Sequence, residues 1–204
     1  MSGHSEHRRQ PRFSKGHHKR TIGLYRTRRG HRIHRNGGID QIMIKLITTI
    51  FGVGYLRPAP GTWGSLAALP MAWGVHEFFG LTGFIATSVI VSFLGWWATA
   101  QHTRGSDNHD PSEIVVDEVI GQWIALLPVF IGSAHMGADT LALWPGWVTA
   151  FVGFRLFDIT KIGPIGWADR RGDALGVMLD DAIAGIFAAL LVMILAALSH
   201  GVLM

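Results

Sequence analysis

Hydrophobic and polar positions follow one another in long blocks along this chain rather than alternating every second residue. Apolar runs occupy 81–100, most of 114–132, 141–162 and 182–198, and polar or Gly/Pro-rich sequence separates them. Long apolar blocks of this kind are typical of buried or lipid-facing helices, whereas half-buried strands show a period of two. The pattern therefore predicts an all-α fold.

The apolar blocks are long enough to cross a bilayer. Residues 81–100 carry no charge, and about 20 apolar residues suffice for a helix that crosses the hydrocarbon core. The sequence predicts a helical membrane protein, a bundle with short loops and two to four membrane-spanning segments.

The remaining elements are predicted from local signals. Ser65 is a plausible N-cap for a helix over 65–79, and Pro128 should interrupt the helix over 114–132. The last helix should begin near Met178. The other expected segments are an amphipathic helix or interfacial strip over 41–52 and loops over 52–65, 101–113 and 163–176.

Composition supports the membrane assignment and excludes some chemistry. Hydrophobic residues make up 49% of the chain and charged residues 16%, with a mean hydropathy of +0.29; soluble domains carry about 25% charged residues. The chain has no cysteine, which excludes a cysteine nucleophile and thiolate metal ligands.

Charge is distributed very unevenly. Residues 1–40 contain eleven Lys and Arg and two acids, whereas the remainder contains seven basic and twelve acidic residues. We expect a disordered basic tail over 1–42 and a membrane-associated domain over 43–204, with Met43 as an alternative start. The tail suits anionic lipid headgroups rather than nucleic acid. By the positive-inside rule, it places the N-terminus in the cytoplasm.

Acidic residues beside apolar helices are the first candidates for chemistry. A charged carboxylate in lipid costs a few kcal/mol, and a divalent cation would neutralise several at once. Hard oxygen ligands in this number suit Mg²⁺. The alternative for any single pair is a favourable interaction with the helix macrodipole. The predicted metal ligands are Asp117, Glu118, Asp158, Asp180 and Asp181.

Basic and hydroxyl residues are the candidates for binding a phosphate. Arg155, Asp158 and Lys161 are spaced i, i+3, i+6, so they share a helical face. Arg155 and Lys161 suit phosphate oxygens, although Arg155 and Asp158 alternatively form a structural ion pair. A Gly/Pro-rich loop before a helix offers backbone N–H groups to an anion. In that loop Gly61, Thr62 and Ser65 are predicted to bind substrate.

Three motifs in this order resemble the phosphatidylglycerophosphatase A family: RPAPGTWGSLAALP at 57–70, VVDEVIGQW at 115–123 and FRLFDITKIGPIGWADRRGDALGVMLDDAIAGIFAA at 154–189. The resemblance implies an all-helical, membrane-bound, Mg²⁺-dependent phosphatase. It implies functional roles for Thr62, for the five acids named above, and for Arg155 and Lys161. The chain departs from the family pattern at Ile162 and at Asp173-Ala174, and Asp169 and Asp173 are either ligands or bystanders.

These observations lead to one hypothesis and two alternatives. The hypothesis is a phosphatase of the bacterial inner membrane, with its site facing the cytoplasm, that hydrolyses phosphatidylglycerophosphate to phosphatidylglycerol. Asp158, Arg155, Lys161 and Thr62 are the expected catalytic residues. The first alternative is a small cation or proton transporter, because intramembrane acids also mark ion pathways. The second is a non-catalytic adaptor that binds anionic lipid through its tail.

Overall fold

The computed structural model describes residues 37–105 and 111–203, which all belong to the unit His34–Met204. Every regular element in these ranges is helical, which confirms the all-α prediction. Two short 3₁₀ helices, η1 (Val53–Tyr55) and η2 (Thr140–Leu143), precede α2 and α4. The α-helices are α1 (Gly37–Thr48), α2 (Pro60–His102), α3 (Val116–Met136), α4 (Trp144–Thr160), α5 (Pro164–Asp169) and α6 (Ala174–Leu203). The predicted basic tail falls outside the described residues up to position 36, and residues 37–42 form the first half of α1.

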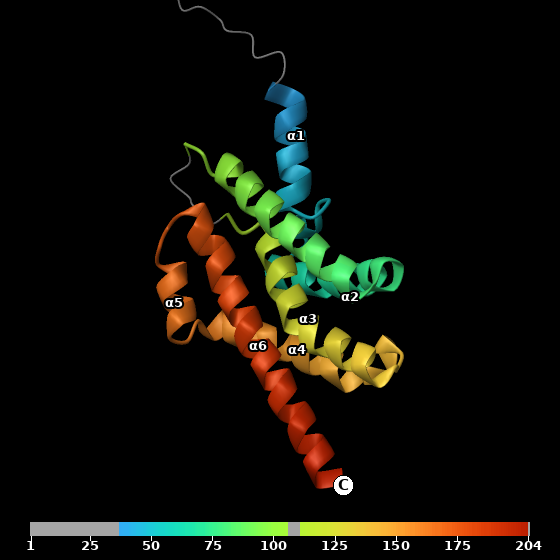
Figure 1. Cartoon of the computed structure of the whole chain (residues 1–204). Coiled ribbons are helices and arrows are strands. Elements are labelled where there is room, and N and C mark those ends of the chain that lie inside the picture. The colour runs from blue at the N-terminus through green and yellow to red at the C-terminus, as the bar shows by residue number, and fades with distance from the viewer. Residues whose placement is uncertain (1–36, 106–110, 204) are drawn as a thin grey trace, which may run out of the picture. The chain divides into compact units, whose positions relative to one another are not determined.

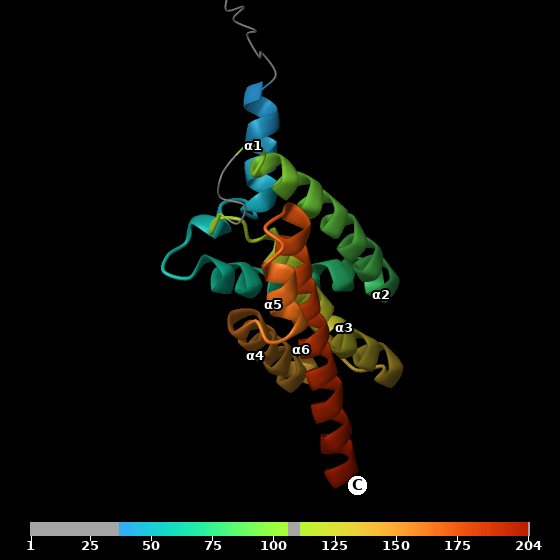
Figure 2. The same cartoon turned by 90° about the vertical axis from the view of Figure 1, so that its left-hand side faces the viewer.

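Four segments are long and apolar enough to cross a membrane: Pro60–His102, Val116–Met136, Thr140–Thr160 and Ala174–Ser199. Four is the upper limit of the two to four membrane-spanning segments that the sequence predicts. The first of them is broken at Gly80, whose φ of 66° and ψ of −174° are not helical. Its two parts turn back on one another there, as Figures 1 and 2 show. The break separates the two apolar segments that the sequence predicted on either side of residue 80.

One end of the bundle gathers the helix termini that carry charge, and we refer to it as the charged end. It holds both termini of α2, the start of α3, the end of α4 and the start of α6. Thr48 Oγ1 lies 2.9 Å from His102 Nδ1, and the Val115 N–H donates to the Thr48 carbonyl at 2.8 Å. Lys161 Nζ donates to Asp180 Oδ2 at 2.8 Å, which joins α4 to α6.

The opposite end holds the break at Gly80 and the connection between α3 and α4. His76 of α2 stacks on Phe130 of α3 with ring centroids 4.3 Å apart, and Phe130 meets Trp147 of α4 edge-on at 5.5 Å. α6 reaches this region as well, because Val192 and Leu195 line one groove together with residues of α3 and α4. Each long helical segment therefore runs between the two ends.

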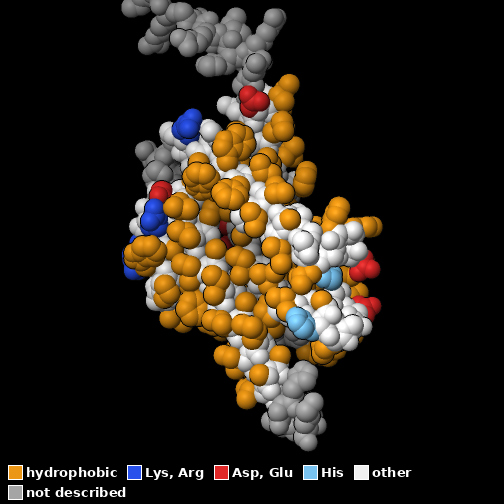
Figure 3. Space-filling view, in the orientation of Figure 1, with side chains coloured by type: hydrophobic (Ala, Val, Ile, Leu, Met, Phe, Trp, Pro, Cys, Tyr) orange, Lys and Arg blue, Asp and Glu red, His pale blue; other side chains and the backbone are white. Residues whose placement is uncertain are grey.

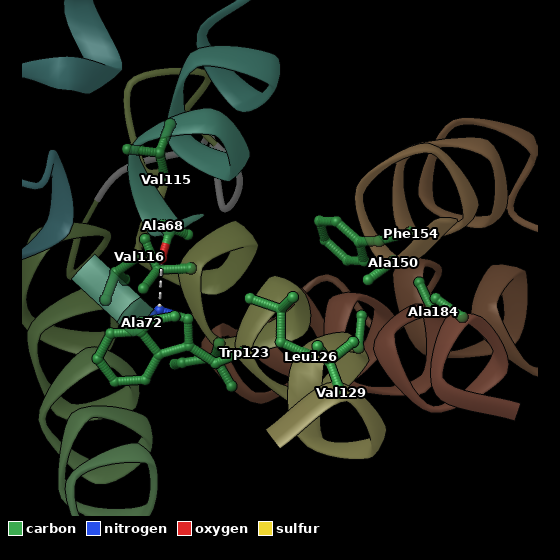
Figure 4. Packing of buried hydrophobic residues seen from close by; sticks show 14 of the residues in the cluster. Ala68, Ala72, Val115, Val116, Trp123, Leu126, Val129, Ala150, Phe154 and Ala184 are labelled. Carbon is green, nitrogen blue, oxygen red and sulfur yellow. Dashed lines mark hydrogen bonds between the residues drawn. The ribbon is translucent and has the colours of Figure 1, made fainter. Parts of the chain in front are cut away.

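α3 lies at the centre and packs against α2, α4 and α6. Trp123, which is 2% exposed, donates its indole N–H to the Ala68 carbonyl at 3.0 Å, as Figure 4 shows. Phe84 packs on both Trp123 and Phe130. Small residues on the neighbouring helices, such as Ala150 and Ala184, let the helices approach α3 closely, as they do in membrane bundles. The central position of α3 fixes the acids at its first turn.

Four local predictions are corrected by the structure. The loop predicted over 52–65 ends early, because Pro60 begins α2 and proline suits the first helical position. Ser65 is therefore not an N-cap: it lies inside α2 and donates to the Gly61 carbonyl at 2.9 Å. Pro128 does not interrupt α3, which is continuous to Met136, as bundled membrane helices tolerate proline.

The fourth correction concerns the region before the last helix. The loop predicted over 163–176 contains the short helix α5, which starts with a proline at its first position. α6 then begins at Ala174 rather than near Met178. Asp173 accounts for this earlier start, because its carboxylate accepts from the Gly176 N–H at 2.7 Å in the manner of an N-cap.

Candidate active site

A polar cavity of about 260 Å³ opens at the charged end of the bundle. It is formed where α2 begins, α3 begins, α4 ends and α6 begins. Five carboxylates and two cationic side chains face it. The lining residues are Ala59, Pro60, Gly61, Ser112, Ile114, Asp117, Glu118, Arg155, Asp158, Lys161, Val177, Asp180 and Asp181.

The five predicted metal ligands meet in this cavity. They form two groups, one of Asp117, Glu118 and Asp181 and the other of Asp158, Asp180 and Asp181. Within each group the carboxylate oxygens lie within 4.8 Å of one another. Asp181 belongs to both groups, so it sits at the centre of the cluster. Three helices, α3, α4 and α6, each contribute at least one of these carboxylates.

Burial makes this cluster suitable for a cation. Asp117, Asp180 and Asp181 are only 6%, 5% and 3% exposed. Glu118 Oε2 and Asp180 Oδ1 are buried without a hydrogen-bond partner among the described residues. Buried carboxylates are normally paired or bound to a metal, and two cationic side chains do not balance five acids. The donor set is entirely oxygen, which fits a hard divalent ion.

The side chain of Arg155, a residue of α4, reaches the start of α2. Its Nη1 donates to Asp158 Oδ2 at 2.7 Å and to Ser65 Oγ at 3.4 Å. The ion pair that the sequence offered as an alternative is therefore present, and both of its members line the cavity. The Arg155 Nε is buried without a hydrogen-bond partner in the described part of the chain. Arg155 is thus held in place by Asp158 and Ser65, while its Nε has no partner among the residues that the structure describes.

The first turn of α2 packs directly against these side chains. A Cβ atom at Gly61 would lie 2.2 Å from Glu118 Oε1 and 3.2 Å from both Nη atoms of Arg155. Only glycine leaves room for the backbone to come this close. Ser65 is fully buried one turn later and contacts Arg155. Thr62 lies half-buried in the same turn, and it is not among the residues that line the cavity.

Lys161 is held by two carboxylates. Its ammonium donates to Asp180 at 2.8 Å and also to Asp169, the last residue of α5. Burial disfavours the charged form of Lys161, but these hydrogen bonds and the nearby charges outweigh it and raise the pKa of Lys161. A Cβ at Gly166 would lie 2.6 Å from the Lys161 carbonyl, so α5 folds tightly back onto this residue.

The two acids whose roles the sequence left open are separated by the structure. Asp169 contacts Lys161, which lines the cavity. Asp173 instead pairs with Arg171 at 3.0 Å and caps the first turn of α6. The Arg171 guanidinium and the Gly176 N–H lower the pKa of Asp173. Neither acid lines the cavity itself.

Glycine also governs how α3 and α6 bring their acids together. A Cβ at Gly185 would lie 2.3 Å from the Gly121 carbonyl oxygen, and a Cβ at Gly121 would lie 2.6 Å from the Asp181 carbonyl. Close helix crossings in membranes use small residues for this reason. The crossing lies one turn beyond Asp117 on α3 and one turn beyond Asp181 on α6, so it fixes their separation.

Sequence reasoning missed several residues around the cavity. Ala59, Pro60, Ser112, Ile114 and Val177 line it, and nothing in their residue types distinguishes them from ordinary loop or core positions. The acidic and basic members could be recognised because charge beside an apolar helix is unusual.

Comparison with known proteins identifies the family. The sequence profile of the family described as phosphatidylglycerophosphatase A matches residues 46–196, a range that includes every residue lining the cavity. The chain belongs to the phosphatidylglycerophosphatase A family. The resemblance inferred from the three sequence motifs is therefore confirmed.

Several individual proteins are similar to most of this chain. A phosphatidylglycerophosphatase A of Haemophilus influenzae is 33% identical over 150 residues, covering 73% of this chain and 86% of the relative. One from Escherichia coli is 34% identical over 146 residues, covering 71% and 78%. A Bacteroides thetaiotaomicron protein provisionally named phosphatidylinositol-3-phosphatase is 34% identical over 151 residues, covering 72% and 89%. No solved structure matches the chain significantly.

Proposed function

We propose that this protein hydrolyses phosphatidylglycerophosphate to phosphatidylglycerol and phosphate, with Mg²⁺ as cofactor, in glycerophospholipid synthesis. The observation that carries the proposal is the cavity in which five carboxylates, Arg155 and Lys161 meet at the end of membrane-length helices. The names of the relatives in H. influenzae and E. coli support the choice of substrate.

Charge balance supports a metal-dependent reaction. A phosphomonoester is itself an anion, so the five carboxylates of this cavity would repel it. Asp117, Glu118, Asp158, Asp180 and Asp181 would hold Mg²⁺, and the ion would supply a Lewis acid for the phosphoryl oxygens and the attacking water. The number and burial of these acids are hard to explain in lipid without such a counter-ion.

The chain's own residues complete the binding site. The Arg155 Nε has no hydrogen-bond partner among the described residues, and a guanidinium binds phosphate oxygens in a planar, bidentate manner. Lys161 adds a second positive charge that stabilises the negative oxygens as the P–O bond to the lipid breaks. The first turn of α2, with Gly61 pressed against Glu118 and Arg155, presents backbone N–H groups to the same space. We assign Thr62 of this turn to orienting the phosphate, and Ser65, one turn later, to holding the Arg155 guanidinium that binds it.

The distribution of basic residues supports a cytoplasmic site in the bacterial inner membrane. All seven Lys and Arg residues after position 40 lie in segments at the charged end. The connections at the opposite end, around residues 77–80 and 137–143, carry Glu77 and Asp139 but no basic residue. Positive charge marks the cytoplasmic side of membrane proteins, so the cavity would face the cytoplasm.

The position of the acids argues against the transporter alternative. A transporter binds its ions near the bilayer midplane. Here Asp117 and Glu118 lie in the first turn of α3, and Asp158 lies in the last turn of α4. The cavity is close to the helix ends, so it would lie at the depth of lipid headgroups, which suits a lipid phosphatase.

Phosphate release by the purified full chain, reconstituted in vesicles, tests the proposal. We expect release from phosphatidylglycerophosphate that requires Mg²⁺ and exceeds release from phosphatidic acid and from phosphatidylinositol 3-phosphate. Asp158→Asn and Asp181→Asn should abolish release without preventing membrane insertion, whereas Asp139→Asn at the opposite end should retain it. Release that is unaffected by chelating Mg²⁺, or full activity of either cavity variant, would refute the assigned roles.

The same assay separates the enzyme from an adaptor. A chain that lacks residues 1–40 should retain Mg²⁺-dependent phosphate release, because the cavity is built entirely from residues 59–181. An adaptor that acted through its basic tail would lose its function on the same deletion.

A further inference from the structure

α1 carries an apolar face that no other described element covers. Its exposed members are Ile39, Ile42, Met43 and Leu46, with exposed fractions of 70%, 59%, 55% and 41%. Their spacing of i, i+3, i+4 and i+7 places them on one side of the helix. A continuous stripe of this kind is unfavourable in water and indicates an apolar neighbour.

The rest of the α1 surface is polar or packs against the bundle. Asp40, Gln41 and Lys45 are exposed and polar, whereas Thr48 is buried where α1 meets the bundle. α1 is 12 residues long, or about 18 Å at the rise of an α-helix, so it is too short to cross a hydrocarbon core of about 30 Å. A short amphipathic helix with one apolar side is suited to lie in a membrane interface.

From the exposure, spacing and length of α1 we infer that this helix is an interfacial anchor. Its apolar stripe lies between the headgroups and the acyl chains of the leaflet at the charged end. Beyond the stripe, Phe51 in the turn after α1 is 81% exposed and Tyr55, the last residue of η1, is 56% exposed. Figure 3 shows the hydrophobic side chains of α1 merging with the hydrophobic surface of the bundle. The bilayer that surrounds α2 to α6 is therefore also the neighbour of α1.

Charge and backbone geometry agree with this location. Lys45, Arg57 and Arg104 are exposed around the same end, where they suit anionic headgroups. Ile50 and Phe51 have φ of 46° and 54°, in the left-handed region that such residues rarely adopt. This turn buries Ile50 in the core and directs Phe51 outward, an arrangement that an apolar medium around the phenyl ring would stabilise.

The anchor is joined rigidly to the cavity. The Thr48 carbonyl accepts from the Val115 N–H at 2.8 Å, directly before the helical turn that carries Asp117 and Glu118. Thr48 Oγ1 also contacts His102 at the end of α2. The depth at which α1 lies in the leaflet therefore sets the depth of the cavity mouth, whichever lipid is hydrolysed there.

Fluorescence quenching in vesicles tests the inference without measuring activity. Because the chain has no cysteine, a single introduced cysteine in the full chain carries a nitrobenzoxadiazole probe at one known position. Met43→Cys places the probe on the stripe, and Gln41→Cys places it on the polar side as a matched control. The vesicles contain phosphatidylethanolamine and phosphatidylglycerol, with nitroxide-labelled lipid or aqueous iodide as the quencher.

We expect nitroxide lipid to quench the probe at position 43 several times more strongly than at position 41, and iodide to show the reverse order. Equal quenching by lipid at the two positions would overturn the inference. A probe at position 43 that is shielded from both quenchers would also overturn it, because protein rather than lipid would then cover the stripe. Ile42→Cys, on the same stripe, replaces Met43→Cys if that variant does not fold.

Discussion

At the scale of single residues, the position of Lys161 in the cavity depends on Asp169, which lies outside the cavity. Its ammonium is shared between Asp180, which is buried, and Asp169, which is more exposed and lies beyond the cavity lining. The tight return of α5 brings Asp169 into position. Asp169 therefore positions the Lys161 ammonium, which the proposed reaction uses. Asp169 does not line the cavity, so we do not expect it to contact the substrate.

Replacing Asp169 with Asn should lower kcat/KM for phosphate release by about 10-fold, because supporting partners of reactive groups typically contribute about 10–100-fold. Asp169→Glu should restore part of the loss, since it keeps the carboxylate. In a Lys161→Met background, Asp169→Asn should have little further effect, as a double-mutant cycle would show. Equal losses in both backgrounds would contradict the view that Asp169 acts through Lys161.

Asp173 offers a prediction about stability rather than activity. Because Asp173 caps α6, Asp173→Ala should cost about 1 kcal/mol and lower the Tm in detergent at pH 7. The folded-state pKa of Asp173 is lowered by Arg171 and Gly176, so its contribution is present above the ordinary Asp pKa of about 3.9. It is lost as the pH falls through the lowered value.

The measurement is the difference in Tm between the wild type and Asp173→Ala as a function of pH. The difference should be constant between neutral pH and about pH 5. It should shrink below about pH 4, where Asp173 begins to protonate in the unfolded chain while the folded protein still holds it ionised. A difference that persists unchanged at the lowest pH would show that the charge of Asp173 has no part in the effect.

At the scale of elements, the crossing of α3 and α6 determines whether the acids meet. Gly185→Ala places a Cβ against the Gly121 carbonyl oxygen, and a backbone atom cannot move aside without moving its helix. We expect this variant to lose about 1–3 kcal/mol of stability through overpacking and to lose phosphatase activity. Gly74→Ala is the matched control, because a Cβ at Gly74 meets nothing within 4 Å. Full activity of Gly185→Ala would contradict the role of this crossing.

The helices could be predicted from the sequence because their apolar runs are long and their limits are marked by polar residues. The errors lie where short-range signals compete. Ser65 has the chemistry of an N-cap, but Pro60 five residues earlier begins the helix. Pro128 is a helix breaker in water, yet α3 passes through it. α5 was missed because a helix of six residues that itself contains Gly166 gives no periodicity to recognise.

The candidate site was predictable to the extent that charge is unusual beside apolar helices. Asp117, Glu118, Asp158, Asp180 and Asp181 were identified in this way, and the structure brings them together. Their grouping could not be predicted, because it depends on where α3, α4 and α6 cross. The contact of Asp169 with Lys161 likewise depends on the turn before α5, which no sequence pattern revealed.

At the scale of the whole molecule, the separation of charge between the two ends predicts the orientation in the membrane. Arg170 and Asp139 are both exposed and lie at opposite ends. In intact bacterial cells, Asp139→Cys should react with a membrane-impermeant maleimide, whereas Arg170→Cys should react only after the cells are lysed. The reverse order of reactivity would show that the cavity faces away from the cytoplasm.

We propose that carboxylates from α3, α4 and α6 together bind one or more divalent cations. Titration calorimetry of the purified chain with Mg²⁺, in detergent, tests it most directly, with Asp181→Asn as the variant because Asp181 belongs to both acidic groups. We predict saturable binding to the wild type and strongly weakened binding to Asp181→Asn, with unchanged helical content by circular dichroism. Equal Mg²⁺ binding by the two proteins, or none by the wild type, would contradict the account.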